Sequence, residues 1–558
     1  MEKIGNYEFD TFLSPSELID YAVEKFTTRP AVTFYHRDQK IQKTFFEFKK
    51  NIQQMAAYLT QTVQPKQQDP IKARICLIGE PSYEWLVSFY AVAYAGFAAV
   101  LIDCSLSSAE IIDHIERVES DYVLFDEKKM FCQNLTEYAA QHHIHLLRFC
   151  DFCGVFSEFA ESAESFDRVK VLSDDVAVIA YTSGTTGKSK GVMLTNKNLM
   201  SSLSVSCYMA RRKHTRHYTT LAVLPFHHMF QVNTGIQCAL YYGLNICIGK
   251  GVKYFSQSLK EFKPSIVTLV PLAVELMHKN IWAGVRRSHK ERPLRILMAV
   301  SNGLRCVGID LRKKLFQTLR AELGGSLNTI IAGGAPLDDA IIKEFKTWGI
   351  DVLIGYGITE CSPVVSCNRP EIVKKLSVGK PAPVPFYDVK IVDGEILVRG
   401  DIVMKGYYND SQGTWEAFTD DGWFRTGDLG RLDKDGFVYI TGRLKNLIIL
   451  PNGENVSPEE LENIFINIEG IKDVLISERT VNTGKVLTAI IVPEDHLKDL
   501  GETPLRGMFE PEFERLNVTL PAYKRVYRHE IRLEDFEKSS SLKIKRIKEN
   551  YEPWKPKL

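Results

Sequence analysis

One short stretch of the chain, YTSGTTGKSKG at residues 181–191, is rich in glycine and in side chains that carry hydroxyl or amine groups. It resembles a Walker A phosphate loop, G-x-x-x-x-G-K-[ST], but Thr182 stands where the first glycine belongs. A Walker A loop leads straight into a helix, whereas the KGVMLT that follows here is β-branched and extended in character. We therefore predict a hairpin between two strands that wraps a polyphosphate, with the next helix capped at Thr195.

Candidate phosphate contacts fill this loop. Its glycines let the backbone approach a ligand closely, its hydroxyls supply hydrogen bonds, and the ammonium group of Lys190 follows just after it. A surface loop without function is the alternative. The residues predicted to hold the triphosphate are Thr182, Ser183, Gly184, Thr185, Thr186, Gly187 and Lys188.

The elements that must position this loop follow a βαβ rhythm over most of the chain. Apolar runs such as ARICLIG, AAVLID and LNTIIAGG alternate with helical patterns. This alternation predicts an α/β fold of mostly parallel sheets with covering helices. From about Lys390 onward, short hairpins with Asp-Gly turns indicate a β-rich subdomain, and beyond it strands and helices alternate again.

A chain of 558 residues is too long for one compact core. We expect a large domain over residues 1–441 and a small, mobile α+β domain over residues 442–558. The first helix of the small domain should begin at SPEELENIFINI, where Ser457 is the N-cap, Pro458 comes first and acidic residues fill the first turn.

Composition and charge are those of an ordinary globular protein, with 45% hydrophobic and 25% charged residues and a formal net charge of +1. A near-neutral total argues against bulk electrostatic binding of nucleic acid. The uncharged run at residues 86–102 falls short of a membrane span and contains Gly96. A buried helix, a glycine turn and a central strand explain this run better.

The eleven cysteines are mostly scattered, as expected of reduced, buried side chains in a cytoplasmic protein. Cys150 and Cys153 have C-x-x-C spacing, but the sequence shows no second pair for zinc and no thioredoxin-like surroundings. We interpret this spacing as coincidence. The N-terminal residues show no basic-then-apolar signal region, so no export is expected.

Six further motifs follow the loop in a fixed order: LPFHHMF, AGGAPL, GYGITE, RTGDLG, TGRLKNLI and FEKSSSLKIKR. Together with the loop they resemble the adenylate-forming (AMP-binding) enzymes, which include acyl-CoA synthetases, aryl-CoA ligases, luciferases and peptide-synthetase adenylation domains. The resemblance spans nearly the whole chain. The stretch GRLKNLIILPNGENVSPEELE and the spelling of the last motif are most similar to bacterial long-chain fatty acid–CoA ligases.

The resemblance implies an ATP site. Glu360 would hold a Mg²⁺ that bridges ATP phosphates, and Asp428 would accept both ribose hydroxyls. Tyr356 would stack on adenine, and Arg443 would reach the ribose or a phosphate. The alternatives are a lysine partner for Glu360, an Asx turn for Asp428 and a structural ion pair for Arg443. The other implied nucleotide contacts are Gly333, Gly334, Ala335, Gly357 and Thr359.

The catalytic lysine implied by the resemblance is Lys543, whose cation would stabilise the adenylation transition state at the α-phosphate. Leu542 precedes it where the commoner family spelling has glycine, although the spacing to Arg546 is kept. Lys545 is therefore an alternative, and so is a solvated basic tail without a catalytic role.

Two further roles follow from the same resemblance. His228 aligns with the family histidine near the substrate carboxylate, as a steric and polar wall, because a carboxylate needs no deprotonation at neutral pH. A packed core histidine is the alternative. For the second half-reaction, the small domain would rotate about Lys445, so that Gly453 lines the path of the attacking thiol.

The implied substrates are a medium- to long-chain fatty acid, ATP with Mg²⁺, and CoA. The acyl site would come from PFHHMFQVNTGIQCALYYG and SIVTLVPLAVELM. An acyl carrier protein as acceptor, an aryl or other acid, and a non-catalytic nucleotide sensor stay open. Basic clusters in ARRKHTRH, GVRRSHKERPLR and the C-terminal segment are candidates for contact with CoA phosphates, a carrier protein or a membrane surface, or are simply solvated.

Overall fold

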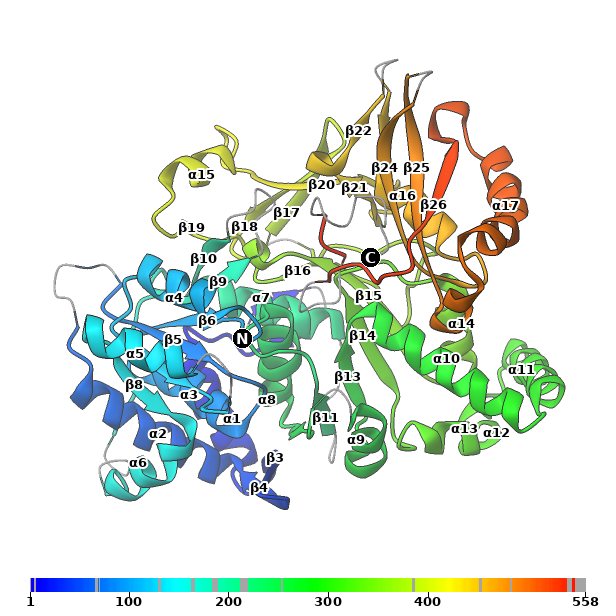
Figure 1. Ribbon diagram of the computed structural model, residues 1–558. Helices are drawn as coiled ribbons and strands as arrows, with labels where there is room; N and C mark the ends of the chain where they lie inside the picture. Colours follow the sequence, from blue (N-terminus) through cyan, green and yellow to red (C-terminus); the bar gives the residue numbers. More distant parts are fainter. Residues whose placement is uncertain are drawn as a thin grey trace. The chain divides into compact units, whose positions relative to one another are not determined.

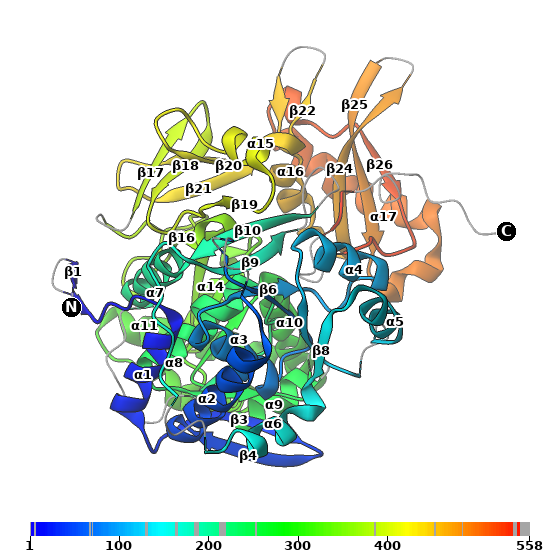
Figure 2. The ribbon, with the colours of Figure 1, turned by 90° about the vertical axis from the view of Figure 1, so that its left-hand side faces the viewer.

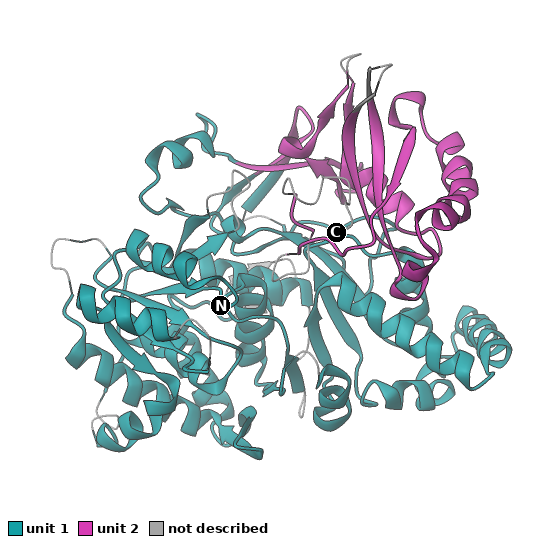
Figure 3. Ribbon diagram, in the orientation of Figure 1, with its two compact units in different colours: residues 1–389, 398–424 teal, residues 390–397, 425–558 magenta. Residues whose placement is uncertain are grey.

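The computed structural model describes residues 2–4, 7–65, 69, 71–128, 132–161, 166–182, 189–210, 219–251, 254–383, 387–450, 454–481, 484–538 and 544–546. The chain divides into two compact units, coloured separately in Figure 3. The first unit comprises Met1–Val389 and Val398–Phe424, and the second comprises Lys390–Leu397 and Arg425–Leu558.

A seven-stranded sheet in the first unit carries the loop motif. Its strands β9, β6, β5, β7 and β8 are parallel neighbours, and β10 and β19 are added antiparallel at one edge. Strands β5 and β6 are buried at every residue, as parallel strands covered on both faces must be. In sheet order the strands are β19 (Gly406–Tyr407), β10 (Lys190–Thr195), β9 (Val176–Thr182), β6 (Ala98–Ile102), β5 (Arg74–Ile78), β7 (Tyr122–Phe125) and β8 (His145–Arg148).

An eight-stranded sheet, also in the first unit, carries the glycine-rich motifs. Its interior strands are parallel, and one antiparallel strand closes each edge. In sheet order the strands are β16 (Val364–Cys367), β15 (Asp351–Gly357), β14 (Thr329–Gly333), β13 (Ile266–Leu269), β11 (Thr219–Ala222), β12 (Asn245–Ile248), β3 (Pro30–His36) and β4 (Gln39–Thr44). A separate small hairpin pairs β1 (Glu2–Ile4) with β2 (Tyr7–Phe9).

Helices cover both sheets of this unit (Figures 1 and 2). The α/β class with mostly parallel sheets, predicted from the βαβ rhythm, is confirmed. The helices are α1 (Pro15–Phe26), α2 (Phe45–Thr62), α3 (Tyr83–Tyr94), α4 (Ser108–Arg117), α5 (Cys132–His142), α6 (Phe152–Glu158), α7 (Asn196–Ala210), the π-helix η2 (Phe230–Gln237), α8 (Cys238–Tyr242), α9 (Phe255–Phe262), α10 (Pro271–Arg287), α11 (Glu291–Cys306), α12 (Arg312–Leu315), α13 (Gln317–Glu322), α14 (Asp339–Thr347) and α15 (Ser411–Glu416).

The uncharged run at residues 86–102 forms the three predicted pieces. Most of α3 is buried, Gly96 turns the chain with φ +72°, and β6 lies inside the seven-stranded sheet. Helix α3 begins where the Ser82 side chain accepts a hydrogen bond from the Trp85 amide. Within the described part of the chain, every helix is too short or too polar to cross a membrane.

The second unit has its own core. Strands β24 (Ile471–Val481), β25 (Gly484–Pro493) and β26 (Arg528–Ile531) form a sheet against which α16 (Pro458–Phe465) and α17 (Glu502–Thr519) bury Phe465 and Phe509. As predicted, α16 starts at N-cap Ser457 with Pro458 first. The domain boundary at residue 442 stays a prediction.

The remaining strands form a four-stranded sheet and a small hairpin. The sheet strands β17 and β18 contribute residues to both units, whereas most of β20 and all of β21 belong to the second. These strands are β17 (Tyr387–Val392), β18 (Glu395–Gly400), β20 (Phe424–Leu432) and β21 (Val438–Arg443), and the hairpin strands are β22 (Ile448–Ile449) and β23 (Asn455–Val456).

Candidate active site

The loop motif joins two antiparallel strands, as predicted. Lys190 on β10 lies opposite Thr182 on β9, and the helix α7 begins only at Asn196. The Thr195 side chain accepts a hydrogen bond from the Asn198 amide at 3.1 Å, which confirms the predicted capping position. The loop residues Ser183, Gly184, Thr185, Thr186, Gly187 and Lys188 lie outside the described residues.

The two ends of this loop are hydrogen-bonded to each other, and helix α4 contacts them. The Ser189 hydroxyl donates to the Thr182 carbonyl at 2.7 Å, and the Arg117 guanidinium donates to the Ser189 carbonyl at 2.5 Å. Arg117 also covers the Tyr181 ring, and that ring stacks on His114 with centroids 4.0 Å apart. A helix about 70 residues upstream therefore fixes the two ends of the loop, a contact that no sequence motif predicts.

The glycine-rich motifs lie at the carboxyl ends of two neighbouring parallel strands. Gly333 on β14 pairs in register with Gly355 on β15, and ligands typically bind outside the carboxyl ends of such strands. Glycine is required here: a Cβ on Gly357 would lie 1.9 Å from the Pro363 carbonyl oxygen, and Gly334 has φ +92°. Ala335 follows directly after these glycines.

Glu360 lies just beyond the end of β15, in the short 3₁₀ turn Thr359–Cys361. The Tyr407 hydroxyl donates to its carboxylate at 3.1 Å, and the Met404 amide donates to its carbonyl at 2.8 Å. Burial and the neighbouring carboxylate raise the pKa of Tyr407 far above its ordinary value, so the hydroxyl stays protonated and remains a donor. Tyr407 therefore orients Glu360.

Glu360 is the predicted magnesium ligand, and this role stays a prediction. A cation lies nearby, because the Lys190 ammonium group is 4.4 Å from the Tyr407 ring centre and 3.4 Å from the Asp410 carboxylate. The described residues contain no cluster of three or more His, Cys, Asp or Glu side chains that could hold a metal ion. One carboxylate combined with substrate phosphate oxygens and waters is the arrangement that Mg²⁺ typically adopts.

An apolar pocket of about 110 Å³ lies beside the glycine-rich motifs. Gly333, Gly334, Tyr356 and Gly357, all predicted nucleotide contacts, line it together with apolar side chains. Phe230 of the predicted acyl stretch is among its lining residues, whereas helix α7 was not predicted to contribute and SIVTLVPLAVELM supplies no lining residue. The principal apolar side chains are Met209, Phe230, Ile331, Leu353, Val364 and Cys367.

The two histidines of LPFHHMF differ in environment. His227 is buried with its Nε2 atom 3.4 Å from an Asp103 oxygen, and burial lowers its pKa. His228 is only half-buried and directly precedes the turn into the π-helix η2, a helix type often found at functional sites. The core interpretation thus applies to His227, while the proposed role of His228 stays a prediction.

The predicted ribose residues of the second unit are paired with each other. Asp428 on β20 lies opposite Arg443 on β21, and the Arg443 Nε atom is 2.8 Å from an Asp428 oxygen. Asp428 is 3% exposed, and its amide donates to the Thr426 hydroxyl. The structural ion pair considered for Arg443 is therefore present, and the ribose roles stay predictions.

Lys445, the predicted hinge residue, lies in the 3₁₀ turn Leu444–Asn446 directly after β21. Burial and, to a lesser degree, the Arg443 charge lower the pKa of Lys445 to about 8. Gly453 lies outside the described residues, in the connection between β22 and β23. The hinge and thiol-path roles stay predictions.

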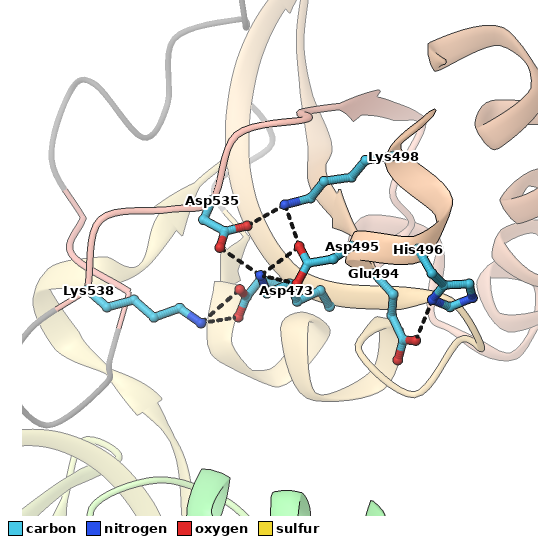
Figure 4. A network of polar contacts seen from close by, with 8 residues as sticks. Asp473, Glu494, Asp495, His496, Lys498, Asp535 and Lys538 are labelled. Atoms are coloured by element: carbon cyan, nitrogen blue, oxygen red, sulfur yellow. Dashed lines mark hydrogen bonds and ion pairs between the residues drawn. The ribbon is translucent and has the colours of Figure 1, made fainter. Parts of the chain in front are cut away.

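Lys543 lies outside the described residues, but both flanks of its segment are anchored within the second unit. Lys538 forms a backbone bridge with Ile544 and an ion pair with Asp473 at 2.8 Å (Figure 4). Arg546 pairs with Glu462 at 2.7 Å.

Additional ion pairs surround these anchors. Lys498 lies 2.7 Å from both Asp495 and Asp535, close to the Lys538–Asp473 pair (Figure 4). Lys545, the alternative catalytic lysine, pairs with Glu537 at 2.5 Å. In the described flanks Lys545 is therefore paired with Glu537.

Known proteins are similar to this chain in sequence and in fold. The chain is 31% identical to long-chain-fatty-acid–CoA ligase FadD15 of Mycobacterium bovis over 417 residues, covering 70% of this chain and 68% of that protein. The crystal structure of ATP-bound MatB from Rhodopseudomonas palustris superposes with a TM-score of 0.73 at 22% identity, over 95% of this chain and 97% of that one.

A third similar protein is the Mycobacterium tuberculosis fatty acyl CoA synthetase, with a TM-score of 0.63 at 21% identity over 96% of this chain and 97% of that one. At the level of families, residues 19–408 match the AMP-binding enzymes, and residues 445–552 match the AMP-binding enzyme C-terminal domain. Because these matches include both glycine-rich strand ends and the anchored lysine segment, the chain belongs to the AMP-binding enzyme family.

Proposed function

We propose that this AMP-binding enzyme is an acid–thiol ligase that uses ATP and Mg²⁺ to activate a medium- to long-chain fatty acid and then transfers the acyl group to CoA. One observation carries the proposal: the predicted adenine contacts and a set of apolar side chains line the same pocket. An apolar acid bound there meets the nucleotide at the carboxyl ends of β14 and β15. The fatty acid ligases among the similar proteins support this choice of substrate.

In the first half-reaction a carboxylate oxygen of the acid attacks the α-phosphorus of ATP. A new P–O bond forms, the bond to the bridging oxygen breaks, and pyrophosphate leaves. Backbone amides and hydroxyls of the loop that starts at Thr182 hold the triphosphate, and the Lys543 cation stabilises charge at the α-phosphate. Mg²⁺, when bound at Glu360, neutralises phosphate charge.

The acid needs positioning rather than activation, because it is already ionised at neutral pH. In this proposal His228 forms a polar wall beside the substrate carboxylate, supported by its partial exposure next to buried His227. Asp428 accepts the ribose hydroxyls, and Arg443 stays within reach of the ribose because the two side chains are already in contact.

In the second half-reaction the thiol sulfur attacks the acyl carbonyl, a thioester forms, AMP leaves and the thiol proton is released. In this proposal the small domain rotates about Lys445. The rotation moves Lys543 away from the reacting carbonyl and brings the segment around Gly453 close to it. The position of Lys445 in a short turn between β21 and β22 supports this role.

Two kinds of thiol have the chemistry that the second half-reaction needs. A phosphopantetheine thiol on an acyl carrier protein has the same chemistry as that of CoA and is the alternative acceptor. An aryl acid is the alternative substrate. A non-catalytic nucleotide sensor is disfavoured because Glu360 and Lys543 are both present. Peripheral contact with a membrane that supplies fatty acid is also part of the proposal.

The test is acid-dependent pyrophosphate release measured over a panel of fatty and aryl acids with Mg·ATP. Each acid is assayed with CoA and, separately, with a holo carrier protein. We expect release with medium- to long-chain fatty acids and thioester formation with CoA. If no acid stimulates pyrophosphate release, the proposed function is wrong, and thioester formation with the carrier protein alone would reassign the acceptor.

A further inference from the structure

Helix α11 presents apolar residues on its outward face. Its inner residues Leu294, Leu297 and Met298 pack on the core of the eight-stranded sheet. A surface helix normally turns polar residues outward. Here the outward positions Ile296 and Val300 are 65% and 50% exposed, and their spacing of four residues places them on one face of the helix.

Further exposed apolar residues follow directly after the helix. Val307, Ile309 and Leu311, in the turn after α11, are 71%, 46% and 41% exposed. Figure 1 shows α11 at the periphery of the first unit, next to α10 and α12. Isolated apolar residues on a surface are ordinary, but a contiguous group on one element marks an interaction site.

The same segment concentrates positive charge. Residues 286–314 contain nine Lys or Arg and two acidic residues, a net charge of +7, whereas the whole chain carries +1. Arg286, Arg287 and Arg292 are exposed at one end of the helix, and Lys313 and Lys314 at the other. Basic residues thus border the apolar face at both ends.

We propose that the surface formed by α11 and its two flanks, residues 286–314, docks onto an anionic lipid membrane. The charges are attracted to acidic headgroups, and the row of Ile296, Val300 and Val307 enters the boundary between headgroups and acyl chains. An acidic protein partner would be complementary to the charge but would leave the apolar row without a complement. The pairing of both features on one helix therefore favours the bilayer.

Docking would keep the enzyme at the surface that holds its fatty acid. The inference rests on the membrane contact included in the proposed function, and its test is independent of the reaction. Membrane attachment can be measured in the absence of turnover. The proposed attachment needs only the residues of α11 and its flanks. These residues are far in sequence from Glu360, Asp428 and the other candidate site residues.

The experiment is co-sedimentation of the full chain with vesicles of phosphatidylcholine alone or with about one third phosphatidylglycerol. Two double variants are compared with the wild type: Arg286→Glu/Arg292→Glu, and Ile296→Ser/Val300→Ser. Matched controls are Lys170→Glu/Lys434→Glu and Leu172→Ser/Val518→Ser, which change residues that are also exposed but lie elsewhere in the chain. Thermal unfolding and activity with water-soluble octanoate check that the variants are folded.

We expect the wild type and both controls to bind the anionic vesicles, with binding that weakens between about 0.1 M and 0.5 M salt. Each α11 variant should bind at least about ten-fold more weakly. Loss of binding in both variants supports the docking surface even if no acid is activated, an outcome that would defeat only the proposed function.

Three results would overturn the docking surface. The wild type could fail to bind anionic vesicles, or folded α11 variants could bind as well as the wild type. In the third, the charge variant would lose binding to an acidic holo carrier protein while its vesicle binding was unchanged, which would assign the surface to a protein partner.

Discussion

Tyr407 donates its hydroxyl hydrogen to the Glu360 carboxylate at 3.1 Å, although the two residues are 47 positions apart in the chain. The contact exists because edge strand β19 pairs with β10, the strand that leaves the loop motif. One hydroxyl therefore connects the candidate metal carboxylate to the strand that carries Lys190, whose ammonium group lies over the Tyr407 ring.

Replacing Tyr407 by phenylalanine should raise the Mg²⁺ concentration needed for half-maximal pyrophosphate release by about ten-fold, because Glu360 loses the donor that orients it. Tyr408→Phe is the matched control, since its hydroxyl donates to the Val118 carbonyl and not to Glu360. Magnesium titrations of both variants check this prediction. An identical Mg²⁺ requirement in the two variants would show that Tyr407 has no positioning role.

Part of this site could be predicted because the information is local. The β-branched residues after the loop motif predict a strand, and Ser457-Pro458 predicts a helix start; both elements are present. The glycines of AGGAPL and GYGITE could also be identified from the sequence. The structure shows why glycine is needed, because Gly357 has no room for a side chain against Pro363.

The contacts between distant elements could not be predicted. Arg117 reaches the Ser189 carbonyl, and helix α7 lines the pocket, only because of how helices pack on sheets and how strands align. Hydrophobic periodicity identifies an element and its buried face but does not specify which side chain of another element it meets. The Tyr407–Glu360 hydrogen bond was missed for the same reason.

Asp428→Asn should remove discrimination between ATP and 2′,3′-dideoxy-ATP. If Asp428 binds the ribose hydroxyls, the wild type should prefer ATP by about ten-fold or more, because hydrogen bonds to a charged group contribute about 1.5–3 kcal/mol. The variant should accept both nucleotides with similar KM. Asp435→Asn, in the exposed turn of the same hairpin, is the control. A variant that still prefers ATP by the wild-type ratio would contradict the ribose role.

Lys445 should react with an amine-specific acetylating reagent at unusually low pH. Its pKa is lowered to about 8, so about half of its side chains are neutral and nucleophilic at that pH. Labelling measured by mass spectrometry should reach half its maximum near pH 8 for Lys445, while labelling of the lysine in a short unstructured peptide should still rise toward pH 10. Parallel profiles for the two lysines would contradict the lowered pKa.

The lowered pKa of Lys445 also determines how the contribution of this residue to stability changes with pH. The folded protein releases the Lys445 proton near pH 8, whereas the unfolded chain holds it up to its ordinary pKa of 10.5. The unfolding free energy contributed by this group therefore increases as the pH rises through that window. Lys445→Met should accordingly raise the melting temperature more at about pH 7 than at about pH 10. An equal change at both pH values would indicate a packing effect.

Lys543 and Lys545 are two residues apart, yet they should behave differently. The Lys545 side chain is paired with Glu537, and the segment around it is anchored by Lys538–Asp473 and Arg546–Glu462. Lys545→Ala should therefore leave pyrophosphate release within about three-fold of the wild type, as loss of an exposed ion pair typically does. Lys543→Ala should lower it by about 100-fold or more, because a cation directed at the developing phosphate charge is lost.

Measuring the second half-reaction distinguishes a catalytic role of Lys543 from an effect of its substitution on folding. Thioester formation from pre-made acyl-adenylate and CoA does not need a cation at the α-phosphate, so Lys543→Ala should reduce its rate far less than the rate of adenylation. Rapid-quench measurement of both half-reactions, with Lys545→Ala as the matched control, checks this difference. Equal losses in the two half-reactions would reject the adenylation role of Lys543, and a larger adenylation loss in Lys545→Ala would move that role two residues along the chain.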